Sequence, residues 1–409
     1  MLAELRKIRY PIEFGLLVTL CFFLPLYEAP KGLASIAYVV TWLVNRLRAR
    51  DFGGRIDIWD VLIAGWIASG YVVAAFAGLD GHEWIGARDL HHYGLLLWLV
   101  KRGGYSSSEI RWLIGTLVAS AVVGLFHGYW RWWSGIGKSG TLQLHSVGHV
   151  NHTAIYLAIM LGVCASWLFT RWKAWRAGIL VVTLAVTALV LVSLDVTASR
   201  GAIGVGLALL PLLALVWWPR SHAALAASIV TVVAVVVVNA MTGAEVVQKQ
   251  QRNVAQENVL SFRDGVWRMS LVAWERYPVF GVGMDNYSLI TLERVKTWRE
   301  EAGKRYERAD FAQFPHGHSI YLNTLAERGV IGFAVLVAVL LAWLVWLARF
   351  RPRPADDDLD WLLWGCAASA WFVTAAAGTV NTTLHHEHGI LAALLLGLWL
   401  SRRKDSRAS

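Results

Sequence analysis

Residues Phe314–Gly332 read FPHGHSIYLNTLAERGVIG and join a long polar stretch to an apolar segment that lacks Asp, Glu, Lys and Arg from Gly329 to Ala348. An apolar segment of about 20 residues is long enough for a helix to cross the hydrocarbon core of a bilayer. Two histidines, a tyrosine and a glutamate stand just before it. The stretch therefore predicts a membrane helix whose entrance carries groups suited to acid–base chemistry.

The whole chain is more apolar than a soluble domain of ordinary composition. It has 409 residues, of which 56% are hydrophobic and 16% charged, and its mean hydropathy is +0.48. We expect an all-α polytopic membrane protein with about twelve transmembrane helices. Besides the segment already quoted, the candidate spans are Phe14–Leu26, Leu33–Val44, Ile58–Phe76, Leu90–Val100, Trp112–Trp130, His149–Phe169, Ala177–Leu194, Gly201–Pro219, Ser221–Ala244, Trp361–His386 and His388–Leu400.

The distribution of Lys and Arg predicts the orientation. One alternate set of loops, with the two termini, holds 21 of them, whereas the other short loops hold only Lys31, Arg88, Arg131, Lys138 and Arg200. Basic residues favour the cytoplasmic side, so both termini should be cytoplasmic. Residues 1–240 would then form nine transmembrane helices, 241–317 a long periplasmic loop with amphipathic helices, and 318–409 the last three transmembrane helices and a cytoplasmic tail.

Polar side chains gather toward the predicted outer face. By this topology twelve of the 13 histidines lie at or near it, either lining a polar cavity or serving as interfacial anchors. Asn151 and His152 begin one helix, where Asn151 either lines a cavity or caps the helix. In the loop LDGHEWIGARDLHH, residues 79–92, Arg88 either faces an anion or pairs with Asp89 or Glu83.

Two arginines are placed as anion ligands would be. Arg200, in DVTASRGAIG (residues 195–204), starts an otherwise apolar helix, and the small residues beside it would let a phosphate approach. Arg263 lies in SFRDGVWRMSLVAWERY (residues 261–277), an amphipathic helix whose predicted buried face is Phe262, Val266, Trp267, Leu271 and Trp274. For each arginine the alternative is a side chain that snorkels to the interface.

No metal or other cofactor is expected. The aspartates of ADDDLD, residues 355–360, resemble the carboxylate pair of a metal-dependent transferase, but the predicted topology puts them in a cytoplasmic linker. The three cysteines, Cys21, Cys164 and Cys366, lie in apolar segments and suggest neither a disulfide framework nor a metal site.

Arg200, Arg263 and His318 together suit the transfer of a group from a diphosphate. The arginines can hold and neutralise a leaving diphosphate through bidentate hydrogen bonds, and a histidine can take the proton of an attacking hydroxyl. Two nearby cations would lower the pKa of the imidazole and keep it neutral as a base. His316 is a second candidate for that base.

The order of these motifs resembles the O-antigen polymerase and ligase superfamily of bacterial inner membranes, and most closely the O-antigen ligases of lipopolysaccharide assembly. The resemblance spans residues 148–332: the G-x-x-N-H-T helix start, the S-R-G-A turn, the long loop with Arg263 and PVFGVG, then H-x-x-Y-L with Glu327, Gly329 and Gly332.

The resemblance implies a metal-independent, inverting glycosyltransferase that moves O-antigen polysaccharide from undecaprenyl diphosphate to lipid A-core on the periplasmic face. It implies that His318 is the general base and that Arg200 and Arg263 bind the diphosphate. Tyr321 and Glu327 would be supporting groups, unless they serve helix packing and capping. Partners would be the lipid-linked donor, the lipid A-core acceptor and membrane lipid, with no nucleic acid.

Three alternatives stay open at this stage. An O-antigen polymerase or a protein O-oligosaccharyltransferase would use the same donor with a different acceptor. A transporter or lipid flippase would place ionisable groups near the middle of its helices and show internal repeats, and the sequence has neither feature. The glycan, the accepting sugar, the oligomeric state and the organism do not follow from the sequence.

Overall fold

The computed structural model describes residues 8–136, 141–171, 176–217, 222–242, 245–255 and 260–405. These residues form helices joined by turns, with no strand among them. Some predicted features lie outside the described residues: the loop cations Lys138, Lys173 and Arg220, and the parts of the long outer loop at 243–244 and 256–259.

Each of the twelve predicted membrane segments coincides with a helix, so the all-α polytopic prediction is confirmed. Their bounds are α2 Pro11–Phe23, α3 Glu28–Ala49, α4 Ile58–Ala75, α5 Glu83–Lys101, α6 Ser107–Trp133, α7 Val150–Arg171, α8 Ala177–Val196, α9 Arg200–Trp217, α10 His222–Thr242, α14 Ile320–Arg349, α15 Asp358–Ala377 and α16 His386–Asp405. Among the described residues, eight helices are both long and apolar enough to cross a membrane: α4, α6 to α10, α14 and α15.

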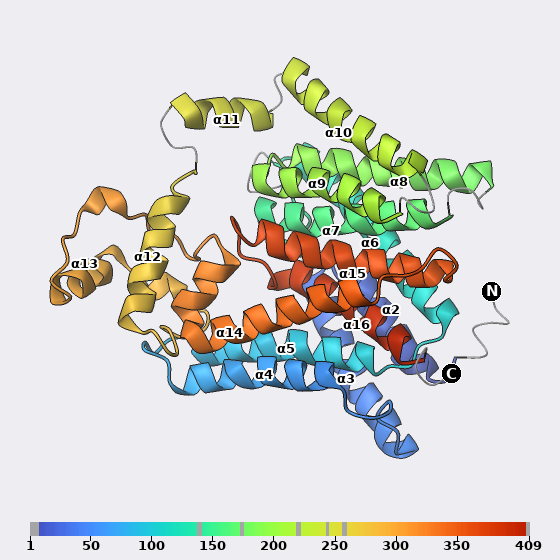
Figure 1. The fold of residues 1–409 in the computed structure, drawn as a ribbon, viewed down its shortest axis with the longest axis horizontal. Coiled ribbons are helices and arrows are strands. Elements are labelled where there is room, and N and C mark those ends of the chain that lie inside the picture. The colour runs from blue at the N-terminus through green and yellow to red at the C-terminus, as the bar shows by residue number, and fades with distance from the viewer. Residues whose placement is uncertain are drawn as a thin grey trace.

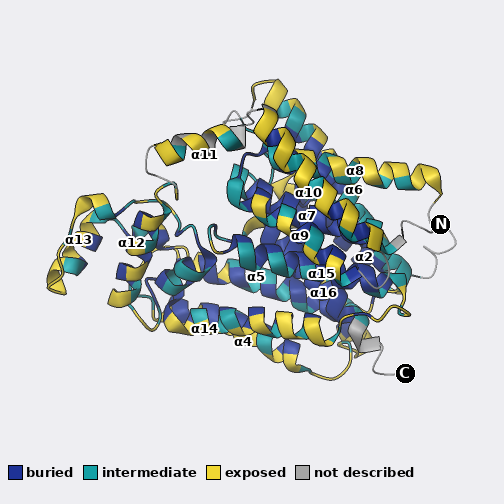
Figure 2. Ribbon diagram, turned by 45° about the horizontal axis from the view of Figure 1, so that its top comes forward, coloured by how far each residue is buried: buried dark blue, intermediate teal, exposed yellow. Residues whose placement is uncertain are grey.

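The bundle helices run roughly along one direction, and α7 lies near its centre (Figure 1). Helix α7 packs against α8, α9 and α15, while α5 packs against α4 and α16. Figure 2 shows these central helices largely buried and α8 largely exposed. Apolar side chains on the exposed flanks, such as those of α8 and α10, suit a surface that faces lipid.

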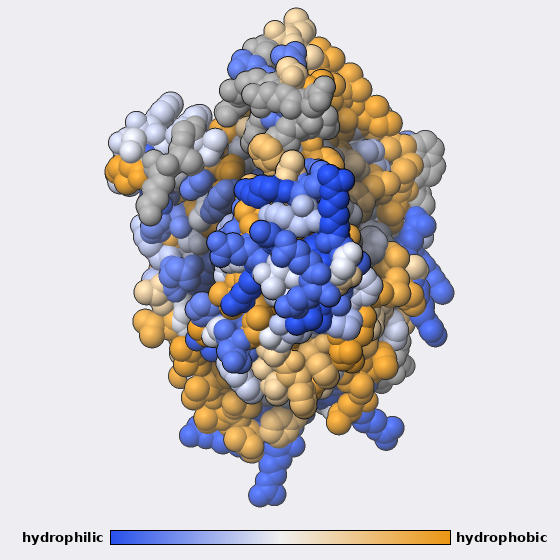
Figure 3. Space-filling view, turned by 90° about the vertical axis from the view of Figure 1, so that its left-hand side faces the viewer, coloured by the Kyte–Doolittle hydropathy of each residue, from blue (hydrophilic) through white to orange (hydrophobic). Residues whose placement is uncertain are grey.

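The described residues between α10 and α14 build a helical cap at one end of the bundle, opposite the two chain ends (Figure 1). It contains α11 Glu245–Ala255, α12 Arg263–Arg276, η1 Tyr287–Leu289, α13 Leu292–Glu301 and η2 Arg308–Asp310. Hydrophilic side chains gather on this end of the molecule, whereas apolar surface surrounds it along the flanks (Figure 3).

Helix α12 forms where the sequence predicts it, but it buries a different face. Val266 is the only buried residue of the predicted apolar face, and Phe262 and Leu271 are exposed. Besides Val266, the helix instead buries Gly265, Met269, Ser270, Val272 and Ala273. A Cβ added to Gly265 would lie 2.9 Å from the backbone nitrogen of Ala312, so close backbone packing decides which face is buried.

Helix α14 is interrupted at Gly329, and the turn after α12 forms hydrogen bonds with the backbone groups on both sides of the interruption. Gly329 has φ 57° and ψ −161°, which removes it from the helical ladder. Backbone nitrogens of Val282 and Gly283 donate to the carbonyls of Ala326 and Glu327 at 2.9 Å, and Val330 N donates to Pro278 O at 2.9 Å. The cap is thereby joined to α14, which contains most of the Phe314–Gly332 stretch.

Candidate active site

The cap and the bundle bring Arg200 and Arg263 to the same place. Arg200 is the first residue of α9, and its Nη2 donates to Ser261 Oγ at 2.7 Å. Ser261 and Phe262, with φ of 53° and 62°, turn the chain into α12, which begins at Arg263. Two arginines far apart in the sequence therefore lie beside one another, as a diphosphate site would require.

The Arg263 guanidinium is half-buried and rests on neutral acceptors. Its Nε donates to Val380 O at 2.9 Å and its Nη1 to Leu260 O at 3.3 Å. Burial lowers the pKa of Arg263, and the charge of Arg200 lowers it further. An arginine nevertheless stays protonated in proteins. The positive charge at Arg263 is thus not cancelled by a carboxylate among the described residues.

His318 stands next to Arg263. Trp267 Nε1 of α12 donates to its carbonyl at 3.4 Å, and its ring packs against Phe314 with 5.1 Å between ring centroids. Burial, then the neighbouring His316 and Arg263, lower the pKa of His318 to about 3. Its buried Nδ1 has no hydrogen-bond partner among the described residues. His318 is therefore a neutral imidazole at neutral pH, as a general base must be.

A cavity of about 490 Å³ adjoins this group. Its lining includes His149, His152, His316, His385 and His386, together with Asp89, Asp285, Glu327 and Arg328. The His316 and His318 rings are 4.4 Å apart between centroids. Of the two, only His316 lines the cavity. The histidine pair therefore links the cavity to the region of the arginines.

The arginines and His318 are not among the residues that line this cavity. The connector between α15 and α16 packs against both arginine-bearing segments. Its Val380 accepts from Arg263, and a Cβ added to Gly201 would lie 2.9 Å from Val380 Cγ2. The small size of Gly201 therefore serves the close packing of the connector.

Of the other predicted residues, two line the cavity. His152 does so from the start of α7. Glu327 does so from α14, where Asn323 Nδ2 donates to it at 2.8 Å and the Tyr287 backbone nitrogen at 3.2 Å. Both are thus placed to contact a bound substrate.

Three predicted residues do not line the cavity. Tyr321 donates to Ala375 O of α15 at 2.9 Å, a helix-packing contact. Asn151 accepts from Ser199 Oγ at 2.9 Å and so links α7 to the turn before Arg200. Arg88 is exposed, and its Nη2 lies 3.0 Å from Asp89 Oδ1.

Arg328 also lines the cavity, although the sequence motifs do not indicate it. It is 5% exposed, and its Nη2 donates to Ser69 Oγ of α4 at 2.6 Å. An arginine directly before a long apolar segment was the available signal, since such a charge is costly in lipid unless it faces a polar space.

Strained backbone gathers around this end of the molecule. A positive φ in a residue other than glycine is uncommon and persists where the surroundings enforce it. Among the described residues eight show it, and all except Arg50 stand next to the arginines or the cavity: Ala198, Ser261, Phe262, Asp285, His318, Leu384 and His386. Such clustering is typical of functional sites.

Comparison with known proteins agrees with the resemblance drawn from the sequence motifs. Residues 185–337 match a family model described as O-antigen ligase, which confirms that resemblance for this stretch. The stretch contains Arg200, Arg263, His316 and His318, and it ends before the connector that carries His385 and His386. No curated protein matches the chain.

Proposed function

From the match of residues 185–337 to the O-antigen ligase family, we propose that this membrane protein is a glycosyltransferase that uses a lipid-linked diphosphate donor. The observation that carries the proposal is the meeting of Arg200, Arg263 and a neutral His318 at the capped end of the bundle. The donor is O-antigen polysaccharide on undecaprenyl diphosphate, and the acceptor is a sugar hydroxyl of lipid A-core.

The transfer is a single displacement at the anomeric carbon. The His318 imidazole takes the proton of the acceptor hydroxyl, and the acceptor oxygen attacks the anomeric carbon from the face opposite the diphosphate. The bond from this carbon to the phosphate oxygen breaks, and its electron pair leaves with the diphosphate. Configuration is therefore inverted.

Arg200 and Arg263 stabilise the charge that develops on the leaving diphosphate, so the step needs no metal ion. Arg263 is suited to this role because its hydrogen bonds go to backbone carbonyls. Its charge is then available to an anion.

The protein is a multi-pass membrane protein, and we assign it to the bacterial inner membrane with both termini cytoplasmic. The capped end, with the arginines and the histidine-lined cavity, then faces the periplasm. Hydrophilic side chains on this end support that assignment (Figure 3).

The test is transfer in vitro, with purified undecaprenyl-diphosphate glycan as donor and lipid A-core as acceptor. The unmodified protein should form the ligated product with inverted configuration, and His318→Ala should form it at least about 100-fold more slowly. Product formation by His318→Ala at the normal rate would rule out this base.

A second acceptor distinguishes the ligase from the polymerase. The same assay is run with a glycan that carries its own undecaprenyl diphosphate as acceptor. Chain growth on that acceptor, in place of transfer to lipid A-core, would assign the protein as an O-antigen polymerase. Transfer to a protein hydroxyl alone would assign a protein O-oligosaccharyltransferase.

A further inference from the structure

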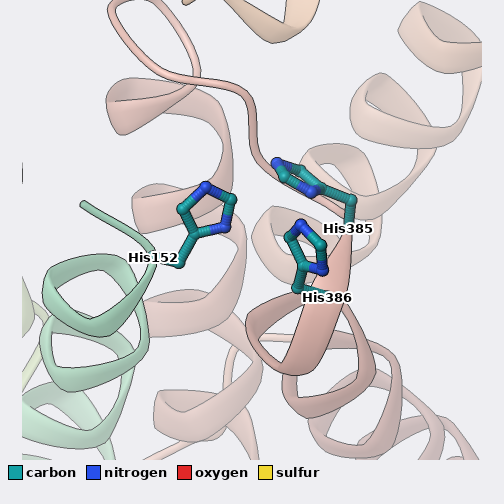
Figure 4. Close-up of side chains that lie close together, drawn as sticks. All are labelled: His152, His385 and His386. Atoms are coloured by element: carbon teal, nitrogen blue, oxygen red, sulfur yellow. The ribbon is translucent and has the colours of Figure 1, made fainter. Parts of the chain in front are cut away.

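Three histidine rings that line the cavity lie close together (Figure 4). His152 comes from the start of α7, whereas His385 and His386 come from the turn into α16. One ring nitrogen from each can be chosen so that all three lie within 4.8 Å of one another. Nitrogens bound to one zinc ion at about 2.0–2.1 Å lie about 3.4 Å apart in tetrahedral geometry, so small ring rotations would bring them to bonding distance.

The hydrogen bonds of His385 leave one nitrogen available to a metal. Its Nε2 lies 2.9 Å from the carbonyl oxygen of Thr382. A carbonyl can only accept, so Nε2 carries the proton and Nδ1 keeps its lone pair. A histidine that binds a metal typically donates its other N–H to such a carbonyl, which fixes the tautomer and the ring.

His152 supplies a second, independent indication. It is 8% exposed, and its Nδ1 is buried with no hydrogen-bond partner among the described residues. A buried polar atom without a partner is costly. Its ring centroid lies 4.7 Å from those of both His385 and His386, so a shared ligand would contact all three.

The turn that carries His385 and His386 is held in an unusual conformation. Leu384 and His386 have φ of 57° and 49°, so left-handed residues stand on both sides of His385. The backbone nitrogen of His386 donates to Tyr93 OH at 3.0 Å, and the Glu387 carboxylate pairs with the buried ammonium of Lys31. A strained turn anchored on both sides presents a preorganised pair of imidazoles.

We propose that His152, His385 and His386 bind one divalent transition metal ion of the zinc class. Imidazole nitrogens suit zinc and its neighbours in the transition series, and three protein ligands leave a fourth position for water or a cavity-bound oxygen. The ion ties the start of α7 to the turn before α16. This site goes beyond the proposed transfer step, which uses His318 and the arginines and not this ion.

The proposed ligands differ from those on which the expectation of no metal rests. That expectation rests on carboxylate pairs and cysteines, whereas these ligands are imidazoles from two distant parts of the chain. None of the three falls within residues 185–337, the stretch that matches the ligase family. The metal site would thus be a feature of this chain outside the matched region.

The test is metal binding by the full-length protein in detergent, purified without a histidine tag and stripped with chelator. Titration with Co²⁺ should show one ion per chain, with the visible absorption of four-coordinate cobalt, and Zn²⁺ should displace it. Loss of an outer-shell partner alone costs about 10- to 100-fold in affinity. His152→Ala, His385→Ala and His386→Ala should each weaken binding at least that much.

His91→Ala is the matched control, because His91 is another histidine of the capped end whose Nδ1 instead lies 2.8 Å from Tyr71 OH. It should bind Co²⁺ like the unmodified protein. X-ray absorption of the unmodified zinc-loaded protein, which needs no variant to fold, should show imidazole nitrogens at about 2.0 Å. Absence of stoichiometric binding, equal binding by the three variants, or a spectrum without imidazole would overturn the site, while the transfer proposal would stand or fall separately.

Discussion

The two ends of the bundle both bury cationic side chains, but they surround them differently. At the end opposite the cap, Lys101 Nζ lies 2.7 Å from Asp60 Oδ1, and Arg102 Nη2 lies 2.6 Å from Asp60 Oδ2. At the capped end, Arg263 donates to backbone carbonyls, and Arg328 donates to the Ser69 hydroxyl. Carboxylates neutralise Lys101 and Arg102, as Glu387 neutralises Lys31 near the cavity, whereas Arg263 donates only to neutral acceptors among the described residues.

This difference indicates what each set of cations does. Removing one member of a buried ion pair is strongly destabilising, because the other charge is left buried without a partner. A cation that rests on neutral oxygens keeps its charge for an anion from outside. The paired end should therefore contribute to the stability of the fold, and the capped end to binding and transfer.

The largest effect on stability should come from Arg102→Ala. The substitution removes one of the two cations that pair with the Asp60 carboxylate, whose side chain is 7% exposed, and leaves only Lys101. We expect a loss of about 3–5 kcal/mol in the free energy of unfolding, measured by denaturant unfolding in detergent. A stability equal to that of the unmodified protein would break the comparison at the paired end.

Arg263→Ala should have the reverse profile. Transfer should fall by about 10²- to 10³-fold, which corresponds to about 2.7–4 kcal/mol, because a group that stabilises developing charge is lost. Thermal unfolding should change little, since no carboxylate is left unpaired. Arg263→Lys should recover part of the rate, because it keeps the charge but not the planar fork.

Arg88→Ala is the control for Arg263, because Arg88 is an exposed arginine paired with Asp89. It should transfer at the normal rate. If Arg263→Ala lowered the stability of the protein but its folded fraction transferred at the normal rate, Arg263 would have a structural role and no role in transfer.

The two neighbouring histidines sharpen the comparison within the capped end. His318→Ala should reduce the turnover number by about 100-fold or more, as expected for a general base. His316→Ala should mainly raise KM, because His316 lines the cavity while His318 lies beside the arginines. A larger loss of turnover in His316→Ala than in His318→Ala would transfer the role of base to His316.

Gly329→Ala tests the joint that holds the cap on the bundle. A Cβ there would lie 2.3 Å from the Val279 carbonyl group, at a φ of 57°. We expect a loss of about 2–3 kcal/mol from overpacking and backbone strain together. Gly104→Ala is the matched control, with φ 67° and open space around its Cβ, and should lose only about 1 kcal/mol. Equal losses of stability in the two variants would mean that the close contact of Gly329 with the turn after α12 does not contribute to the effect.

The smallest expected effect is that of pH on turnover. The neutral form of His318 acts as the base, and its pKa is lowered to about 3. Turnover at saturating donor should therefore change less than about twofold between pH 8 and pH 5. A base with the ordinary pKa of about 6.5 would lose about 30-fold over the same range. A loss of that size in the unmodified protein would show that His318 is not held neutral by its surroundings.

Much of the architecture follows from apolar segment length. Each of the twelve predicted segments is a helix, because a run of apolar residues must satisfy its backbone hydrogen bonds internally. The buried face of α12 could not be read in the same way. Its apolar residues predict one face, but the helix buries another, which includes Gly265, Met269 and Ala273.

The candidate site also has features that follow from local sequence and features that depend on long-range packing. Motif order selects Arg200, Arg263 and His318, and the fold places all three at the capped end. Motif order could not separate the cavity from the arginines, because the position of Val380 against Gly201 is a long-range packing contact. It also passed over Arg328, whose role depends on a bond to Ser69 in a distant helix.

The sequence by itself determined that this chain is a helical membrane protein and that its motifs resemble those of the O-antigen ligases, because hydrophobic length and local motifs are properties of neighbouring residues. Only the tertiary structure decided which histidines share a cavity, that Arg263 donates to a backbone carbonyl, and that His152 meets His385 and His386. Those relations join residues far apart in the chain, and local patterns carry no information about distance in space.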